Sequence, residues 1–349
     1  MTTQSPAQSP DAPTSWLKVS AVVGGLLALL TVLLSAFALP ALNSEPNEIP
    51  IAVAGPEPAV AQIETQLSRQ DPDAFDVTTA ADADEATALI EDREVYGAVV
   101  ADQAGVSVLT AGAASPAIAT MLNQMAAEMS KAQGAEVSVE DVVPLTEDDP
   151  KGSGLAAGAL PLAMAGMLIP ILLSSAVRGV GRRVVGTLVA GAAGGAVVAA
   201  ILQYWFGSIT GDYWVNAAAL ALGVSATAWA LLGLRAVLGQ AGIGLGAAVI
   251  MLLGNPLSGL TSAPEMLPAG WGAFGQMLPP GATGTLLRST AFFDGAAAQQ
   301  PILVLSAWVA AGVLLFAIGE TIAAVRRRRA AASEAETPAA SSEPAEAAG

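Results

Sequence analysis

The sequence predicts a polytopic α-helical membrane protein with six transmembrane helices and an extracytoplasmic α/β domain between the first and second helices. Of its 349 residues 53% are hydrophobic and 13% are charged, about half of the roughly 25% usual in globular proteins. Apolar segments of about 20 residues, long enough to cross a bilayer as a helix, recur along the chain. One acidic insertion, residues 43–154, separates the first of them from the rest.

The chain opens with residues 1–17, which are rich in Ser, Thr, Gln and Pro. That composition favours a disordered cytoplasmic leader. The apolar stretch 18–42, opened by Lys18, is the first predicted transmembrane helix. A signal peptide cleaved near Ala36–Ala38 is the alternative, but the stretch is long for a signal peptide, so we predict an uncleaved anchor.

The insertion 43–154 has the composition of a water-exposed domain. It holds 21 acidic and 4 basic residues, a net charge of −17, whereas the whole chain carries −16. Strand-like runs at 49–54, 75–79, 96–101, 106–110 and 136–143 alternate with helical patterns at 59–70, 82–92 and 116–131. This alternation predicts a small α/β domain, large enough to fold alone.

Two local patterns in the insertion have specific interpretations. Asp82 followed by Glu85 predicts a capping box at a helix start. Two acidic clusters, Asp71-Pro72-Asp73 and Glu147-Asp148-Asp149, are candidates for a Ca²⁺ site, although neither has the spacing of an EF-hand. Solvated surface carboxylates are the simpler interpretation.

Residues 155–325 predict a five-helix membrane domain. Its spans are expected at about 155–177, 184–206, 217–238, 241–260 and 301–325. Residues 255–300 are rich in Pro and Gly, and their apolar pieces are too short to span a bilayer, so we expect an outer re-entrant segment. Residues 326–349 begin with four arginines that stop transfer and continue as a disordered cytoplasmic tail.

The cations set the expected orientation. With alternating connections, Lys18, Arg178, Arg182, Arg183, Arg235 and Arg326–Arg329 all fall on one side of the membrane. The positive-inside rule makes that side cytoplasmic. We therefore expect a multi-pass protein of a bacterial plasma membrane with both termini in the cytoplasm and the acidic domain outside.

Some residues inside the predicted spans are candidates for packing or function. The pairs Gly191 with Gly195 and Gly242 with Gly246 have the spacing that allows helix backbones to approach closely, although an Ala/Gly-rich sequence also produces it by chance. Glu320 is the acid within a predicted span. Intramembrane acids are functional candidates, but Glu320 also lies close enough to pair with Arg326 or Arg327 near the inner interface.

Several classes of function are excluded by composition. The chain has no Cys, no His and no P-loop, which excludes thiolate and histidine catalysis and ATP hydrolysis of the P-loop kind. The acidic net charge argues against a nucleic-acid partner. We expect no enzymatic activity, no cofactor, no metal and no catalytic residue in this chain.

Short motifs follow one another in a distinctive order. They are Ile49–Val53, Arg93–Ala98, Asn255–Gly259 and Leu278–Ala282 with Leu287–Arg288. Together with the layout of spans, they give the chain an organisation that resembles ABC-type-2 exporter permeases, most closely the phage-infection-protein (Pip) branch. The resemblance implies a subunit that exports an amphipathic or lipid-like substrate and dimerises with itself or a second permease.

The resemblance also implies a partner and the sites that serve it. A separate ATP-binding subunit would contact the short cytoplasmic connection at Arg178, Gly179, Arg182 and Arg183. The outer segment would supply gating residues, expected at Asn255, Pro256, Pro279, Pro280, Gly281 and Arg288. The alternative is a surface protein without transport activity, whose acidic outer domain binds an envelope component, a protein or a phage.

Overall fold

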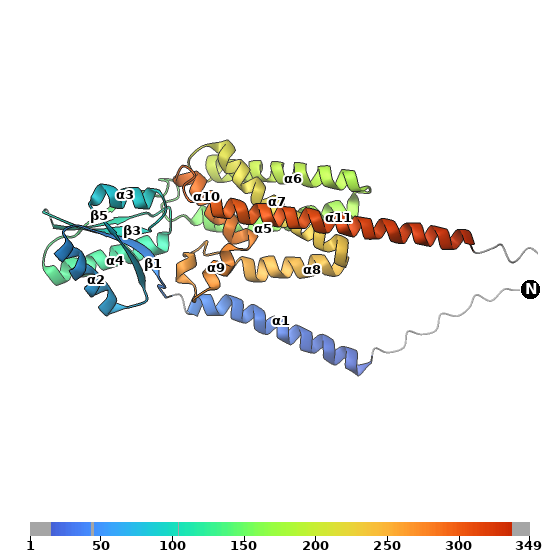
Figure 1. Cartoon of the computed structure of the whole chain (residues 1–349), viewed down its shortest axis with the longest axis horizontal. Coiled ribbons are helices and arrows are strands. Elements are labelled where there is room, and N and C mark those ends of the chain that lie inside the picture. The colour runs from blue at the N-terminus through green and yellow to red at the C-terminus, as the bar shows by residue number, and fades with distance from the viewer. Residues whose placement is uncertain (1–14, 43–44, 104, 337–349) are drawn as a thin grey trace, which may run out of the picture.

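The computed structural model describes residues 15–42, 45–103 and 105–336. Figure 1 shows a β-sheet with its helices at one end of a bundle of long helices. We call residues 45–103 and 105–150 the sheet unit, the adjoining end of the bundle the sheet end, and the opposite end the far end. The predicted leader up to residue 14 and the predicted tail after residue 336 lie outside the described residues.

The sheet has five strands in the order β2-β1-β3-β4-β5. β1 is parallel to β2 and β3, whereas β4 is antiparallel to β3 and parallel to β5. The strands and the three helices beside them form close to the predicted positions. Their bounds are β1 Ile49–Ala54, α2 Glu57–Gln70, β2 Phe75–Ala80, α3 Ala83–Glu91, β3 Gly97–Asp102, β4 Gly105–Thr110, α4 Pro116–Gln133 and β5 Ser138–Asp141.

Side chains of β1, which lies between β2 and β3, alternate between two cores. Ile51 and Val53 pack in a cluster with residues of α2 and α4, whereas Ala52 and Ala54 pack in a cluster with Ile90 of α3. Successive side chains of a strand point to opposite faces, which explains the division. The sheet unit is therefore a sheet between two helical layers.

The predicted capping box is present with one change of partner. The Glu85 backbone N–H donates to Asp82 Oδ1 at 2.9 Å, and Glu85 Oε2 accepts from the backbone N–H of Ala81 at 2.6 Å. The returning carboxylate thus satisfies the amide one residue before the N-cap. Both contacts fix the start of α3.

The rest of the described chain is almost entirely helical. The bounds are α1 Trp16–Leu42, α5 Ser153–Ala176, α6 Val180–Ala200, the π-helical turn η1 Ile201–Trp205, α7 Tyr213–Leu238, α8 Gln240–Ala248, the π-helical η2 Val249–Gly254, the 3₁₀ turn η3 Pro264–Met266, α9 Trp271–Gln276, α10 Pro279–Phe292 and α11 Gln299–Glu336. α7 lies against α5, α6, α10 and α11, and its middle is buried.

Three helices of the described chain are long and apolar enough to cross a membrane: Val180–Trp205, Tyr213–Leu238 and Gln299–Ala332. Shorter apolar helical stretches lie at Trp16–Val32, Met164–Ala176 and Gln240–Gly254. The prediction of a mostly helical chain that contains helices long and apolar enough to cross a membrane is confirmed.

Several helix ends differ from the predicted boundaries, and the span predicted at 241–260 ends with η2 at Gly254. α1 begins at Trp16, inside the expected leader, and α11 continues to Glu336, past the expected end of the last span at 325. The extension of α11 contains mainly Ala, Arg and Glu, which have high helix propensity, so the helix persists after its apolar part has ended.

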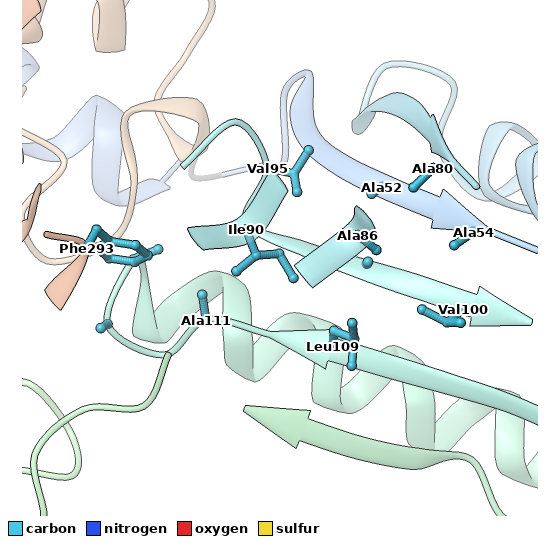
Figure 2. Packing of buried hydrophobic residues seen from close by; sticks show 13 residues of the cluster. Ala52, Ala54, Ala80, Ala86, Ile90, Val95, Val100, Leu109, Ala111 and Phe293 are labelled. Carbon is cyan, nitrogen blue, oxygen red and sulfur yellow. The ribbon is translucent and has the colours of Figure 1, made fainter. Parts of the chain in front are cut away.

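The sheet unit and the helical bundle share hydrophobic cores. Phe293, which follows α10 and is 6% exposed, belongs to the cluster of Ile90 and Ala111 in the sheet unit, and Figure 2 shows its ring beside them. On the other face of the sheet, Ala263 and Met266 join the cluster of α2 and α4. Side chains from 255–300 therefore complete both cores of the sheet unit.

Candidate functional site

A polar cavity of about 420 Å³ lies where the sheet unit meets segment 255–300. We call it the junction cavity. Its charged lining residues come from both sides: Glu48, Arg93 and Glu94 from the sheet unit, and Glu265 and Arg288 from the segment. Elements far apart in the sequence thus build one polar compartment at the sheet end.

Arg93 connects the two sides of this cavity. Its Nη1 donates to the Thr285 carbonyl at 3.0 Å and to Ser289 Oγ at 2.6 Å, both on α10. Its guanidinium also lies over the Phe293 ring, 5.1 Å from the centroid. Arg93 has a positive φ of 61°, a left-handed conformation that non-glycine residues adopt infrequently. The α3–β3 turn holds this conformation and aims the side chain at α10.

A second connection joins Tyr96 to Glu265. The Tyr96 hydroxyl donates to Glu265 Oε2 at 2.7 Å, and the Asn47 backbone N–H donates to the Glu265 carbonyl at 3.1 Å. Burial raises the pKa of Tyr96 above its usual range, and the neighbouring Glu265 carboxylate raises it further. The phenol therefore stays protonated at neutral pH and remains a hydrogen-bond donor to the carboxylate.

Arg288 is the most deeply placed charge of the junction, with 6% of its surface exposed. Its Nη2 donates to the Leu260 carbonyl at 2.7 Å. In the part of the chain that the structure describes, no carboxylate lies within ion-pair distance of it. Burial lowers the pKa of Arg288 to about 10, so the side chain is cationic at neutral pH. A buried cation without a paired anion is costly to maintain.

A third polar contact closes the junction from the side of α4. Ser115 Oγ donates to the Ser262 carbonyl at 2.7 Å and accepts from the Ile118 backbone N–H at 3.3 Å. The same hydroxyl thus caps α4 and binds segment 255–300. Together with the contacts of Arg93 and Tyr96, it fixes the sheet unit on the bundle at three separated points.

A second cavity, of about 490 Å³, lies at the far end of the bundle. We call it the arginine cavity. Four arginines from different elements line it: Arg178 from the α5–α6 connection, Arg183 from α6, Arg235 from α7 and Arg327 from α11. Glu320 of α11 is the carboxylate in this lining.

The predicted partner-contact residues divide into two groups here. Arg183 is held inside the chain: its Nε donates to the Val177 carbonyl at 2.9 Å, its Nη2 donates to the Ser174 carbonyl at 3.3 Å, and its Nη1 lies 3.7 Å from Glu320. Arg178 and Arg182 are exposed. Gly179 begins the turn into α6 with a φ of 95°, which favours glycine.

Glu320 forms ion pairs across two helices. It lies 3.7 Å from Arg183 and 3.9 Å from Arg327. Of the two neighbours expected from sequence, Arg327 is thus a partner, while Arg326 forms no ion pair within the described residues. The pairing with Arg183 was not predicted, because it depends on α6 and α11 meeting at the far end.

Both glycine pairs pack within the chain. A Cβ atom at Gly195 would lie 2.3 Å from the Ala221 backbone nitrogen of α7, and one at Gly191 would lie 2.4 Å from Ser225 Oγ. The pair Gly242 and Gly246 packs against the last turns of α7, with Cβ positions 2.2 Å from the Leu234 carbonyl oxygen and 2.4 Å from Leu231 Cδ2.

The predicted gating residues do not form one site. Pro279 and Pro280 start α10, where a proline lacks no required hydrogen bond, and Pro280 packs against Gly254. Gly281 lies against the Gly275 carbonyl. The carbonyl of Asn255, which precedes Pro256, accepts from Ser258 Oγ at 2.7 Å. Of the six, Arg288 lines the junction cavity.

Two of the acidic residues considered for Ca²⁺, Asp149 and Asp71, accept hydrogen bonds from backbone amides. Asp149 accepts from the backbone N–H groups of Ser153 and Gly154 at 2.8 and 2.7 Å, which caps the start of α5. Asp71 accepts from the Asp73 backbone N–H at 3.2 Å. Over the described ranges, no group of three or more Asp and Glu side chains is placed to hold a metal ion.

Sequence reasoning did not select Arg93, Tyr96 or Glu265 as site residues. One signal was available, since Arg93 is among only four basic residues in the strongly acidic stretch 43–154. Arg93 and Tyr96 lie about 170 to 200 residues from their partners in the sequence, so the sequence alone did not indicate these contacts. Comparison with protein-family models, curated proteins and solved structures found no match for this chain.

Proposed function

We propose that this chain is the membrane subunit of an ABC-type-2-like exporter in a bacterial plasma membrane. It moves an amphipathic or lipid-like substrate and is powered by a separate ATPase subunit. In this proposal α1, α5, α6 with η1, α7, α8 with η2, and α11 cross the bilayer. Segment 255–300 is re-entrant, the sheet unit lies outside, and both termini lie in the cytoplasm.

The observation that supports transport is the buried polar junction. A binding domain tethered to a membrane anchor needs no buried contact with that anchor. Here the sheet unit and the bundle share the Phe293 core and the contacts of Arg93 and Tyr96 with segment 255–300. A movement of α10 relative to α7 would therefore move the sheet unit as well, as a domain that takes part in a transport cycle requires.

The junction cavity suits the polar part of an amphipathic substrate. It carries both signs of charge, and Arg288 offers a cation without an ion-pair partner among the described residues. A cavity of about 300–1,000 Å³ is the usual size for binding a small ligand. The proposal places the headgroup of the substrate here as it leaves the helices.

One observation favours the alternative of a surface-binding protein. The acidic residues of 43–154 give that stretch a charge of −17, and many of its carboxylates are exposed, among them Asp71, Asp84, Glu91 and Glu128. Such a surface attracts a basic envelope component or protein. The two functions differ in whether the chain assembles with an ATPase.

The test is purification of the tagged full chain from native membranes. We expect a second protein that contains a P-loop to copurify, and the complex to hydrolyse ATP in vesicles. Changing Arg178→Lys together with Arg182→Lys keeps the charge but removes the planar guanidinium groups. If these exposed arginines contact the ATPase, this variant loses the partner while still inserting in the membrane.

The matched control is Arg326→Lys together with Arg328→Lys, which alters two exposed arginines of α11. This variant should retain the ATPase. Recovery of no P-loop protein with the wild-type chain would contradict the proposal and favour the surface-binding alternative. Equal recovery with both double variants would mean that the guanidinium groups of Arg178 and Arg182 do not contact the ATPase.

A further inference from the structure

The arginine cavity has an excess of positive charge that the chain does not neutralise. Arg178, Arg183, Arg235 and Arg327 line it, against the single carboxylate of Glu320. Glu320 is shared between Arg183 and Arg327. Throughout the described residues, the side chains of Arg178 and Arg235 have neither a hydrogen-bond partner nor an ion-pair partner. Two guanidinium groups therefore remain available beside one cavity.

The arrangement goes beyond what a topological signal needs. Cations that set orientation can lie anywhere near the ends of the spans. These four come from the α5–α6 connection, α6, α7 and α11, and they converge on a single hollow between helices. Charges of the same sign repel one another when they converge, so their proximity indicates an anion that balances them.

We propose that the arginine cavity binds a phosphate group, as carried by the headgroup of an anionic lipid or by a free phosphate. Guanidinium groups form paired hydrogen bonds with phosphate oxygens, which makes arginine well suited to this ligand. A liquid water molecule takes about 30 Å³, so a cavity of about 490 Å³ accommodates a phosphate together with water.

A lipid source rests on the proposed orientation, in which the far end lies at the cytoplasmic surface. Anionic lipids are enriched in that leaflet, and basic pockets between helices bind their headgroups. Two of the exposed side chains at the far end, Val180 and Val237, are apolar and offer a surface for acyl chains. Arg183 is held by its contacts with Ser174, Val177 and Glu320, so it gives the cavity a cationic side chain in a fixed position.

The experiment uses the purified full chain in nanodiscs of phosphatidylcholine, with and without phosphatidylglycerol. Native mass spectrometry measures the lipid retained, and thermal unfolding measures stabilisation. The wild-type chain should retain phosphatidylglycerol and unfold at a higher temperature in its presence. Arg178→Gln with Arg235→Gln should weaken this binding about 30-fold, which corresponds to about 1 kcal/mol for each arginine.

The control is Arg182→Gln with Arg328→Gln, an equal change of charge at exposed positions outside the cavity lining. It should bind phosphatidylglycerol as the wild type does. In a second arm, inorganic phosphate is added to the detergent-solubilised chain. Stabilisation by inorganic phosphate without preference for phosphatidylglycerol would support the phosphate site with a free phosphate as its source.

Two results would overturn the proposal. One is a wild-type chain that is stabilised by neither probe. The other is an equal loss of binding in the control variant, which would mean that overall charge, and not the cavity, attracts the anion. Because the assay needs neither an ATPase nor a defined orientation, its failure leaves the proposed export function untouched, and failure of the ATPase to copurify leaves the phosphate site untouched.

Discussion

The guanidinium of Arg93 lies 5.1 Å from the ring centroid of Phe293, so a cation from the sheet unit covers an aromatic side chain that comes from the bundle. Phe293 in turn occupies the core of the sheet unit. This pair joins the electrostatic and the hydrophobic parts of the junction, and it couples the folding of the two units.

Replacing Phe293 with alanine should destabilise the full chain by about 3 kcal/mol, the usual cost of truncating a buried phenylalanine. The variant loses the packing against Ile90 and the contact with Arg93 together. Denaturant-induced unfolding of the detergent-solubilised chain measures the change. Phe274→Ala is the control. Because Phe274 is 49% exposed, its truncation should lower the free energy of unfolding far less. Equal losses in the two variants would mean that Phe293 is not part of a shared core.

Tyr96 should make the junction less stable at high pH. An unfolded tyrosine ionises near pH 10, whereas burial and Glu265 raise the pKa of folded Tyr96. Because the folded state then holds its proton where the unfolded state has lost it, the stabilisation is fully present below about pH 10 and is lost as the pH rises through the folded pKa.

The measurement is unfolding midpoint against pH for the wild type and for Tyr96→Phe. The variant should be about 1–2 kcal/mol less stable at neutral pH, because it leaves the Glu265 carboxylate without its donor. Its unfolding midpoint should also fall less steeply above pH 10 than that of the wild type. Tyr204→Phe, at a side chain that is 70% exposed, serves as the control. An unchanged alkaline profile in Tyr96→Phe would refute this account.

Gly195→Ala should destabilise the bundle, whereas Gly194→Ala should not. A Cβ at Gly195 would lie 2.3 Å from the backbone of α7 at Ala221, but one at Gly194 would meet Val224 Cγ1 at an ordinary 3.7 Å. Overpacking of this kind costs about 1–3 kcal/mol. Thermal unfolding in detergent compares the two variants, and similar midpoints would show that α6 and α7 do not approach closely at Gly195.

Single cysteines test the proposed orientation, since the natural chain has none. Ser138→Cys lies on the exposed edge strand β5, and Ala331→Cys lies on the exposed end of α11. An impermeant thiol reagent added to intact cells should label the first and not the second. After the cells are lysed, both should react. Labelling of Ala331→Cys in intact cells would contradict the proposed orientation and place the end of α11 outside.

The sequence by itself determined the elements of this protein, because their signals are local. The apolar runs of α6 and α7, the short apolar strand run Ile49–Ala54 and the Asp82–Glu85 cap all depend on residues that are neighbours in the chain. Local propensity also accounts for the extension of α11 past the predicted boundary at 325, through Ala and Arg, where helix propensity prevailed over the loss of apolar character.

Only the tertiary structure decided which of these elements meet. Arg93 donates a hydrogen bond to Ser289, Tyr96 donates one to Glu265, and Arg183 pairs with Glu320, each across a long stretch of chain. A single sequence carries no periodic or spacing signal for such pairs, since each depends on how the helices pack. The physical reason is burial. In the sequence, Phe293 and Arg288 cannot be told apart from other aromatic and basic residues. Packing removes both side chains from water, and the free energy of each then depends on the groups that it contacts.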